Sequence, residues 1–187
     1  PLRGYRDDAD VRLGILVVAA TIPTGVIGLL FKDDFEQLAA QPQAVGVALL
    51  VTAALLTATH WIRPQARELN LSMALAIGLI QGMAITPGIS RSGATIALAL
   101  LLGLATINAA RFSFLISIPA IAGAAVLKLK DGLGDLDLIN AGLGFVVALI
   151  RGHLEMRWLL ALVQARRFAA FAPYCAVVGI LAIGLAP

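Results

Sequence analysis

The sequence predicts an all-α membrane protein, a polytopic helical bundle that includes a re-entrant helical hairpin. Its composition is the first observation: 60% of the 187 residues are hydrophobic and 13% are charged, against about half and a quarter in soluble domains. The charged residues separate long uncharged runs, and this spacing is the second observation. The third is a Pro-Gly pair, Pro87-Gly88, beside an apolar segment that is too short to cross a bilayer.

Two spans are expected in the first third of the chain. Residues 13–31 are uncharged over a length that can cross the hydrocarbon core, and Pro23 is expected to kink this helix. The polar segment 32–43 is expected to be a loop. Residues 44–62 form the second span, which ends at the charged loop 63–68.

The re-entrant hairpin is expected over residues 70–104. Residues 69–90 are uncharged but contain the Pro-Gly pair, and the apolar core that follows, 94–104, is too short for a hydrocarbon core of about 30 Å. Irregular backbone at membrane depth is tolerated only where protein or a water-filled cavity surrounds it. Two helices that enter and leave the membrane on the same side meet this condition.

Three further spans complete a single membrane domain, 1–187. They are expected at 112–128, 138–165 and 168–186, and the middle one is interrupted by Arg151, His153, Glu155 and Arg157. Alternating the loops between the two sides places these arginines together: Arg3, Arg6, Arg12, Arg63, Arg67, Arg111, Arg166 and Arg167. The other side carries Lys32, Lys128 and Lys130. The larger basic group marks the first side as cytoplasmic.

Charge and cysteine content exclude two classes of function. The net charge of +3 is not gathered into a basic run, so the sequence does not predict a nucleic-acid partner. Cys175 is the single cysteine, which allows no intrachain disulfide and no cysteine metal site. It is interpreted as a small buried hydrophobic residue.

A polar group at the Pro-Gly break suggests an anion site. An arginine at membrane depth costs several kcal/mol unless it is paired or hydrated, and no acidic residue lies between Glu68 and Asp131 to pair with Arg91. A helix is expected to begin near Ser92, and a helix N-terminus presents unpaired N–H groups to an anion. The guanidinium of Arg91 adds a planar pair of donors that suits phosphate. The simpler interpretation is a capped helix whose Arg91 extends to the interface.

The motif around Arg91 resembles a known family. Residues 81–96, QGMAITPGISRSGATI, resemble the second signature of the bacterial undecaprenyl-diphosphate phosphatase family of the bacitracin-resistance type. The similarity extends through 101–104, 109–115 and 118–120, and more weakly to 22–23, 28–31 and 166–174. It therefore spans most of the chain.

The resemblance implies an enzyme of the bacterial plasma membrane with its site on the outer side. Such enzymes hydrolyse the C55 isoprenoid diphosphate to the monophosphate and inorganic phosphate, which recycles the lipid carrier of peptidoglycan synthesis. Arg91 and Ser90 would then be catalytic. The substrate-binding residues would be Gly88, Gly93, Ser92, Thr95 and Gln81. The implied fold is an inverted repeat with two re-entrant hairpins, and the implied partners are undecaprenyl diphosphate, membrane lipid and a second copy in a homodimer.

One part of the family pattern is not found. The family has a first signature with two glutamates, a Ser-Ser-Thr-Gly run and a histidine, which carries the acid/base groups and metal ligands. Without it the first repeat is incomplete, and the chain is expected to be a C-terminal fragment that is inactive alone. A divalent cation, Mg²⁺ or Ca²⁺, is expected to be bound by that signature, and no metal ligand is assigned within this chain. Cys175 also occupies a position where the family has an arginine.

Two alternatives stay open. A transporter or flippase for a lipid phosphate would use the same anion site without cleaving its substrate, because broken helices around an anion site are typical of transporters. A structural membrane subunit would need no site at all. His60, His153 and Glu155 are interpreted as interfacial or charge-compensated residues, since no pattern places them near Arg91. Whether Ser90 or a serine of the first signature attacks phosphorus is also open.

Overall fold

A computed structural model describes residues 9–62, 65–130, 138–165 and 168–186. Within these ranges the secondary structure is helical, apart from one isolated bridge between Arg67 and Leu104. The helices are α1 (Ala9–Leu30), α2 (Lys32–Ala39), α3 (Pro42–Ala58), α4 (Leu71–Met83), α5 (Arg91–Leu101), α6 (Thr106–Lys130), α7 (Leu138–Gln164), the short 3-10 helix η2 (Phe168–Phe171) and α8 (Ala172–Gly184). The expectation of an all-α membrane protein is confirmed.

By length and composition, two helices in the described residues can cross a membrane. They are Asp10–Leu30 and Thr106–Leu129. A third candidate is the pair α2 and α3, if the two are counted together, although they are bent by 101° where they meet. The spans at 138–165 and 168–186 and the extent of the domain stay predictions. The predicted sidedness rests partly on Arg3, Arg6, Arg63, Arg166 and Arg167, which lie outside the described residues.

The expected loop at 32–43 is wrong in its first part, because α2 occupies Lys32–Ala39. Two features of the sequence account for this helix. Asp33 and Asp34 lie in its first turn, where negative charge interacts favourably with the helix dipole. Pro42 then begins α3, and a proline is well placed in the first turn of a helix because its missing N–H would be unpaired there.

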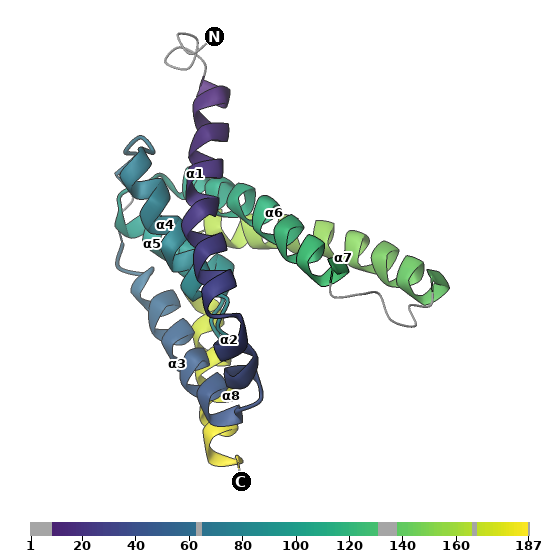
Figure 1. Ribbon diagram of the computed structural model, residues 1–187. Coiled ribbons are helices and arrows are strands. Elements are labelled where there is room, and N and C mark those ends of the chain that lie inside the picture. Colours follow the sequence, from purple (N-terminus) through teal and green to yellow (C-terminus); the bar gives the residue numbers. More distant parts are fainter. Residues whose placement is uncertain (1–8, 63–64, 131–137, 166–167, 187) are drawn as a thin grey trace.

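The body of the molecule is a bundle in which α1 packs against α4, and α3 packs against α8 (Figure 1). Close contact between α3 and α8 depends on two glycines. A Cβ atom built on Gly46 would lie 2.8 Å from the backbone oxygen of Gly179. Small residues at such a crossing let two backbones approach, which is the common way that membrane helices associate.

In the hairpin of α4 and α5, α5 lies inside the bundle and contacts α3, α4 and α6, while α4 keeps an exposed face. Both helices begin at a capping residue. The Asn70 side chain accepts a hydrogen bond from the Met73 amide at 2.9 Å, and the Ser90 hydroxyl accepts one from the Gly93 amide at 3.1 Å. Such caps satisfy donors that have no partner within the helix. The two short helices joined by a turn occupy the range predicted for the hairpin.

α6 and α7 project together from the bundle (Figure 1). Residues 121–129 of α6 and 140–158 of α7 are exposed. Near the end of α7, Leu159 and Leu160 pack against the buried core. This projecting pair therefore leaves the packing around the α4–α5 turn to α1, α3 and the first half of α6.

Candidate functional site

The turn between α4 and α5 is shaped by Gly88. Its φ of +94° lies in the left-handed region, where residues with a Cβ atom are rarely found. The turn also lies tightly against α3, because a Cβ atom on Gly88 would be 2.5 Å from the backbone oxygen of Val45. Both the backbone conformation and the available space therefore require glycine at this position.

Thr52 of α3 ties the turn to the bundle. Its hydroxyl donates a hydrogen bond to the carbonyl oxygen of Gly88 at 2.8 Å and accepts one from the Ser90 amide at 3.0 Å. The side chain is buried, with 2% exposure. Thr52 was not among the predicted site residues, since a threonine in an apolar helix gives no sign of what it contacts.

The first turn of α5 leaves two backbone donors open. The Gly93 amide donates to the Ser90 hydroxyl and the Ala94 amide donates to the Ser90 carbonyl at 2.8 Å, while the Ser90 amide is bound by Thr52. In the described part of the chain, the amides of Arg91 and Ser92 have no hydrogen-bond acceptor. They are the unpaired N–H groups that a helix N-terminus offers to an anion.

The Arg91 side chain is half-buried at the same helix start. Among the described residues it forms no hydrogen bond and no ion pair. The Ser92 hydroxyl likewise has no partner there. The structure thus brings together the predicted residues Gly88, Ser90, Arg91, Ser92 and Gly93. The donors without an acceptor all belong to Arg91 and Ser92.

Thr95 is placed differently from the sequence-based expectation of a residue that contacts phosphate. Its side chain is fully buried, and its hydroxyl bonds to the Arg91 carbonyl at 2.8 Å and to the Ser113 hydroxyl of α6. Ser113 was not predicted as a site residue. In this arrangement Thr95 fixes the start of α5 against α6, and its hydroxyl is already hydrogen-bonded inside the bundle.

Gln81 also lies in the interior, with 1% exposure. Its amide nitrogen donates to the Thr24 hydroxyl of α1 and to the Ile116 carbonyl of α6, both at 3.2 Å. Its Oε1 has no hydrogen-bond partner among the described residues. Gln81 therefore joins α4 to α1 and α6, and no described contact links it to the Ser90–Gly93 segment.

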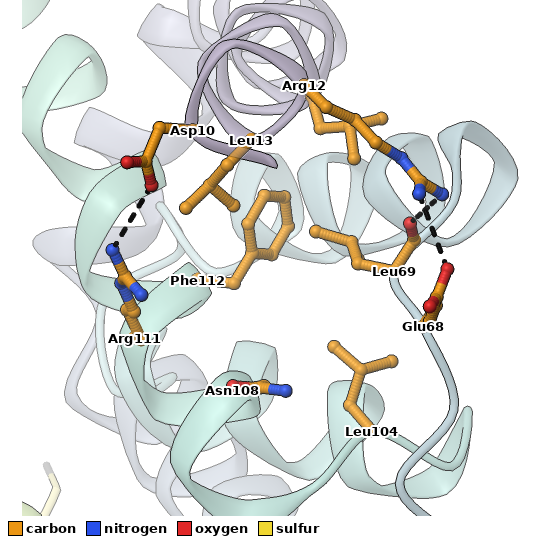
Figure 2. Close-up of a pocket in the computed structure, with 10 residues that line it drawn as sticks. Asp10, Arg12, Leu13, Glu68, Leu69, Leu104, Asn108, Arg111 and Phe112 are labelled. Carbon is orange, nitrogen blue, oxygen red and sulfur yellow. Dashed lines mark hydrogen bonds and ion pairs between the residues drawn. The ribbon is translucent and has the colours of Figure 1, made fainter. Parts of the chain in front are cut away.

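A pocket of about 360 Å³ lies elsewhere, beyond the C-terminal end of α5 (Figure 2). Leu13, Leu16, Leu69, Leu104 and Phe112 give it apolar walls, while Asp10, Arg12, Glu68, Asn108 and Arg111 give it polar ones. Figure 2 shows two ion pairs on its opposite sides, Arg12–Glu68 at 3.4 Å and Arg111–Asp10 at 3.9 Å. None of the predicted site residues lines this pocket, and each of its arginines faces an acid.

The described residues do not fit a divalent cation at the turn. Mg²⁺ and Ca²⁺ prefer carboxylate and carbonyl oxygens. The Ser90–Gly93 segment offers hydroxyls, amide N–H groups and a guanidinium, and the described ranges hold no cluster of three or more His, Cys, Asp or Glu side chains. Glu155 is paired with Arg151 at 2.9 Å on the projecting helix α7, and the His60 ring lies edge-on to Trp61 at the end of α3.

Known proteins match almost the whole chain. The family model described as "Bacitracin resistance protein BacA" matches residues 2–181. A protein of Desulfatibacillum aliphaticivorans named "Undecaprenyl-diphosphatase" is 43% identical over 180 residues, which cover 94% of this chain and 65% of that protein. One of the same name from Halothermothrix orenii is 41% identical over 181 residues, covering 93% and 70%.

Relatives of two lengths are present among these matches. The chain spans about two thirds of the Desulfatibacillum protein. It also matches 99% of a Methanothermobacter thermautotrophicus protein named "Undecaprenyl-diphosphatase", at 43% identity over 179 residues and 91% of this chain. The extent of the family match and these identities show that the chain belongs to the bacitracin resistance protein BacA family.

Proposed function

We propose that this protein is an undecaprenyl-diphosphatase, which hydrolyses undecaprenyl diphosphate to the monophosphate and inorganic phosphate. The relatives that cover most of the chain carry this name. The observation that carries the proposal is the set of donors without acceptors at the start of α5. The Arg91 guanidinium, the Arg91 and Ser92 amides and the Ser92 hydroxyl are adjacent, and they have no partner among the described residues.

These donors would bind the diphosphate as its charge develops during hydrolysis. Phosphoryl transfer needs positioning and charge neutralisation more than covalent chemistry from the protein. The planar guanidinium of Arg91 can bind two phosphate oxygens at once, and the helix N-terminus adds fixed N–H dipoles. Ser90 holds the backbone of the turn and would direct its hydroxyl proton to a phosphate oxygen. Gly88 and Gly93 let the turn pack closely against α3 and the Ser90 cap, so their proposed contribution to substrate binding is to place these donors.

The remaining chemical groups are proposed to come from outside the described turn. By the family resemblance, a divalent cation and the acid/base groups are expected on the family's first signature. The described residues around Arg91 include no cluster of His, Cys, Asp or Glu side chains that would bind this cation. The chain is therefore expected to bind the diphosphate. It is expected to release phosphate slowly, or only when a first-signature segment is added.

We place the protein in the bacterial plasma membrane, with its turn open to the outer side, where spent lipid carrier appears. The isoprenoid tail of the substrate would stay in the bilayer while the head group reaches Arg91. Bilayer lipid and a second copy of the chain are its proposed further partners. The long exposed faces of α6 and α7 suit an apolar environment.

A lipid-phosphate carrier is the second candidate. It is favoured by one observation: the described donors can hold an anion, while no described carboxylate or histidine contacts them. A carrier needs such a site and no base. The names of the relatives favour the hydrolase.

Phosphate release from undecaprenyl diphosphate tests the proposal. The purified chain in detergent with Mg²⁺ is compared with Arg91→Ala and with a matched control, Arg151→Ala, which removes an exposed arginine of α7. A chimera that adds the part of the Desulfatibacillum relative that has no counterpart here is measured in parallel. Release that is lost in Arg91→Ala and kept in Arg151→Ala supports the hydrolase. Binding without release in every form would establish the carrier.

A further inference from the structure

We propose that Thr52 is a positioning residue for diphosphate binding, an inference that rests on the proposed function. Thr52 belongs to α3, outside the hairpin that carries Arg91. Its hydroxyl bonds to the backbone of the turn on both sides of Ile89, at Gly88 and at Ser90. No other described side chain forms hydrogen bonds to both of these backbone groups. It does not reach the start of α5 where the unused donors lie, so its effect on the substrate is indirect.

The two hydrogen bonds of Thr52 affect the binding of an anion in different ways: one holds a backbone acceptor, and the other holds a backbone donor. The bond from its hydroxyl to the Gly88 carbonyl, at 2.8 Å, directs that oxygen toward α3. A carbonyl oxygen turned toward the diphosphate would repel it, so this bond removes an unfavourable dipole. The bond from the Ser90 amide, at 3.0 Å, fixes the residue that caps α5. The amides left for the anion are then those of Arg91 and Ser92.

The turn packs along the face of α3 that carries Thr52. Val45, Thr52 and Leu56 lie at spacings of seven and four, which places them on one side of a helix. A Cβ atom on Gly88 would be 2.5 Å from the Val45 oxygen, and one on Gly93 would be 3.4 Å from Leu56 Cδ2. α3 therefore touches the turn before, at and after Thr52, and the threonine supplies the hydrogen bonds at the centre of that contact.

Burial makes the hydroxyl hard to replace. Thr52 is 2% exposed, so water cannot readily take over its role if the hydroxyl is removed. Thr52→Val keeps the branched shape but leaves the Gly88 carbonyl and the Ser90 amide without their partner. A buried polar group that loses its partner carries the full cost of its desolvation. The turn is expected to relieve this cost by rotating these peptide groups, which displaces Arg91 and Ser92.

The same helix offers a matched control. The Thr57 hydroxyl donates only within α3, to the Ala53 carbonyl at 2.7 Å, and Thr57 is exposed. Thr57→Val makes the same chemical change in the same helix without touching the turn. Thr52→Ser restores the hydroxyl and tests whether hydrogen bonding, and not the methyl group, is what matters.

The experiment compares the wild-type chain, Thr52→Val, Thr52→Ser and Thr57→Val in three measurements. The first is hydrogen exchange of the Ser90 amide. The second is binding of a water-soluble prenyl diphosphate, and the third is phosphate release from undecaprenyl diphosphate resolved into kcat and KM. Thr52→Val is expected to expose the Ser90 amide and to weaken diphosphate binding about tenfold or more, with Thr52→Ser within about threefold of wild type. Thr57→Val should match the wild type in all three.

The outcomes separate the inference from the proposed function. Unchanged Ser90 exchange in Thr52→Val, or diphosphate binding as weak in Thr52→Ser as in Thr52→Val, would overturn the positioning role. A wild-type chain that neither binds the diphosphate nor releases phosphate would overturn the proposed function. In that case increased Ser90 exchange in Thr52→Val would still show that Thr52 holds the turn, while its role in diphosphate binding would fall with the function.

Discussion

Gly78 of α4 lies so close to Ala20 of α1 that a Cβ atom built on the glycine would be 2.0 Å from the Ala20 backbone oxygen. One turn along α1, the Thr24 hydroxyl donates to the Gly78 carbonyl at 2.8 Å. The two backbones therefore touch at this crossing, and the threonine joins them. The contact fixes α4, which leads directly into the turn proposed to bind the diphosphate.

Gly78→Ala is expected to lower the free energy of unfolding by about 1–3 kcal/mol. The new methyl group would meet backbone atoms of Ala20, which cannot rotate away as a side chain could. Gly25→Ala is the control. A Cβ atom on Gly25 would meet nothing within 4 Å, and alanine favours a helix over glycine by about 1 kcal/mol. Thermal unfolding of both variants in detergent measures the difference. Equal midpoints for the two variants would contradict the close crossing.

Replacing Arg91 by lysine separates the charge of the side chain from its shape. Lysine keeps the positive charge but loses the planar pair of donors that can bind two phosphate oxygens. In the form that releases phosphate, the chain alone or the chimera, we expect Arg91→Ala to lower kcat/KM by about 10²–10³, as loss of a transition-state donor does, and Arg91→Lys to recover only part of this. Arg151→Lys on α7 is the control. An Arg91→Lys variant as active as wild type would mean that charge alone is needed.

The hydrogen bond between Thr95 and Ser113 is expected to couple α5 to α6. Thr95→Val and Ser113→Ala should each destabilise the protein by about 1–2 kcal/mol, because each removes the hydrogen bond between two buried hydroxyls. The double variant should lose less than the sum, with a coupling of about 0.5 kcal/mol or more. Urea or thermal unfolding of the four proteins closes the cycle.

A second cycle with Ser117 tests whether this coupling is specific. The Ser117 hydroxyl bonds within its own helix, to the Phe114 carbonyl at 2.6 Å. Thr95→Val and Ser117→Ala are therefore expected to be additive. Additive effects in both cycles would rule out a direct bond between Thr95 and Ser113.

The ion pair of Arg12 with Glu68 at the pocket of Figure 2 should contribute little by itself. Glu68 is 86% exposed, and pairs of this kind are worth at most about 1 kcal/mol and are screened by salt. Arg12→Ala is expected to cost more than Glu68→Gln, because Arg12 also donates to the Leu69 carbonyl at 3.0 Å. Unfolding midpoints at low and high salt measure both variants. If Glu68→Gln lowered the unfolding midpoint as much as Arg12→Ala at high salt, the bond from Arg12 to the Leu69 carbonyl would contribute nothing beyond the ion pair.

The turn and its helices could be predicted because their signals are local. Pro87 and Gly88 break the apolar run, and a helix is expected to begin near Ser92; it begins one residue earlier, at Arg91, with Ser90 as its cap. Each of these properties acts on its own segment of backbone. The same local reasoning failed at 32–39, where polar residues suggested a loop. The acidic residues of that stretch stabilise the first turn of α2 instead.

The partners of the turn could not be predicted, because they come from other helices. Nothing in the sequence of α3 marks Thr52 as the residue that faces Gly88, since the residues on all sides of the helix are mostly apolar. Gln81 and Thr95 lie within the motif, yet their hydrogen bonds run to Thr24, Ile116 and Ser113. Which side of a short helix is covered depends on how the helices cross, and a single sequence does not state this.

The support of the turn by α3, and of α3 by α8, implies an order of assembly. Synthesis proceeds from the N-terminus, so Thr52 leaves the ribosome before the turn that it holds. α8, which packs along α3, follows the turn in chain order. A nascent chain that stops before α8 contains the proposed anion-binding motif but lacks the helix that packs against α3. The order of synthesis therefore delivers the support of Thr52 after the turn that Thr52 holds.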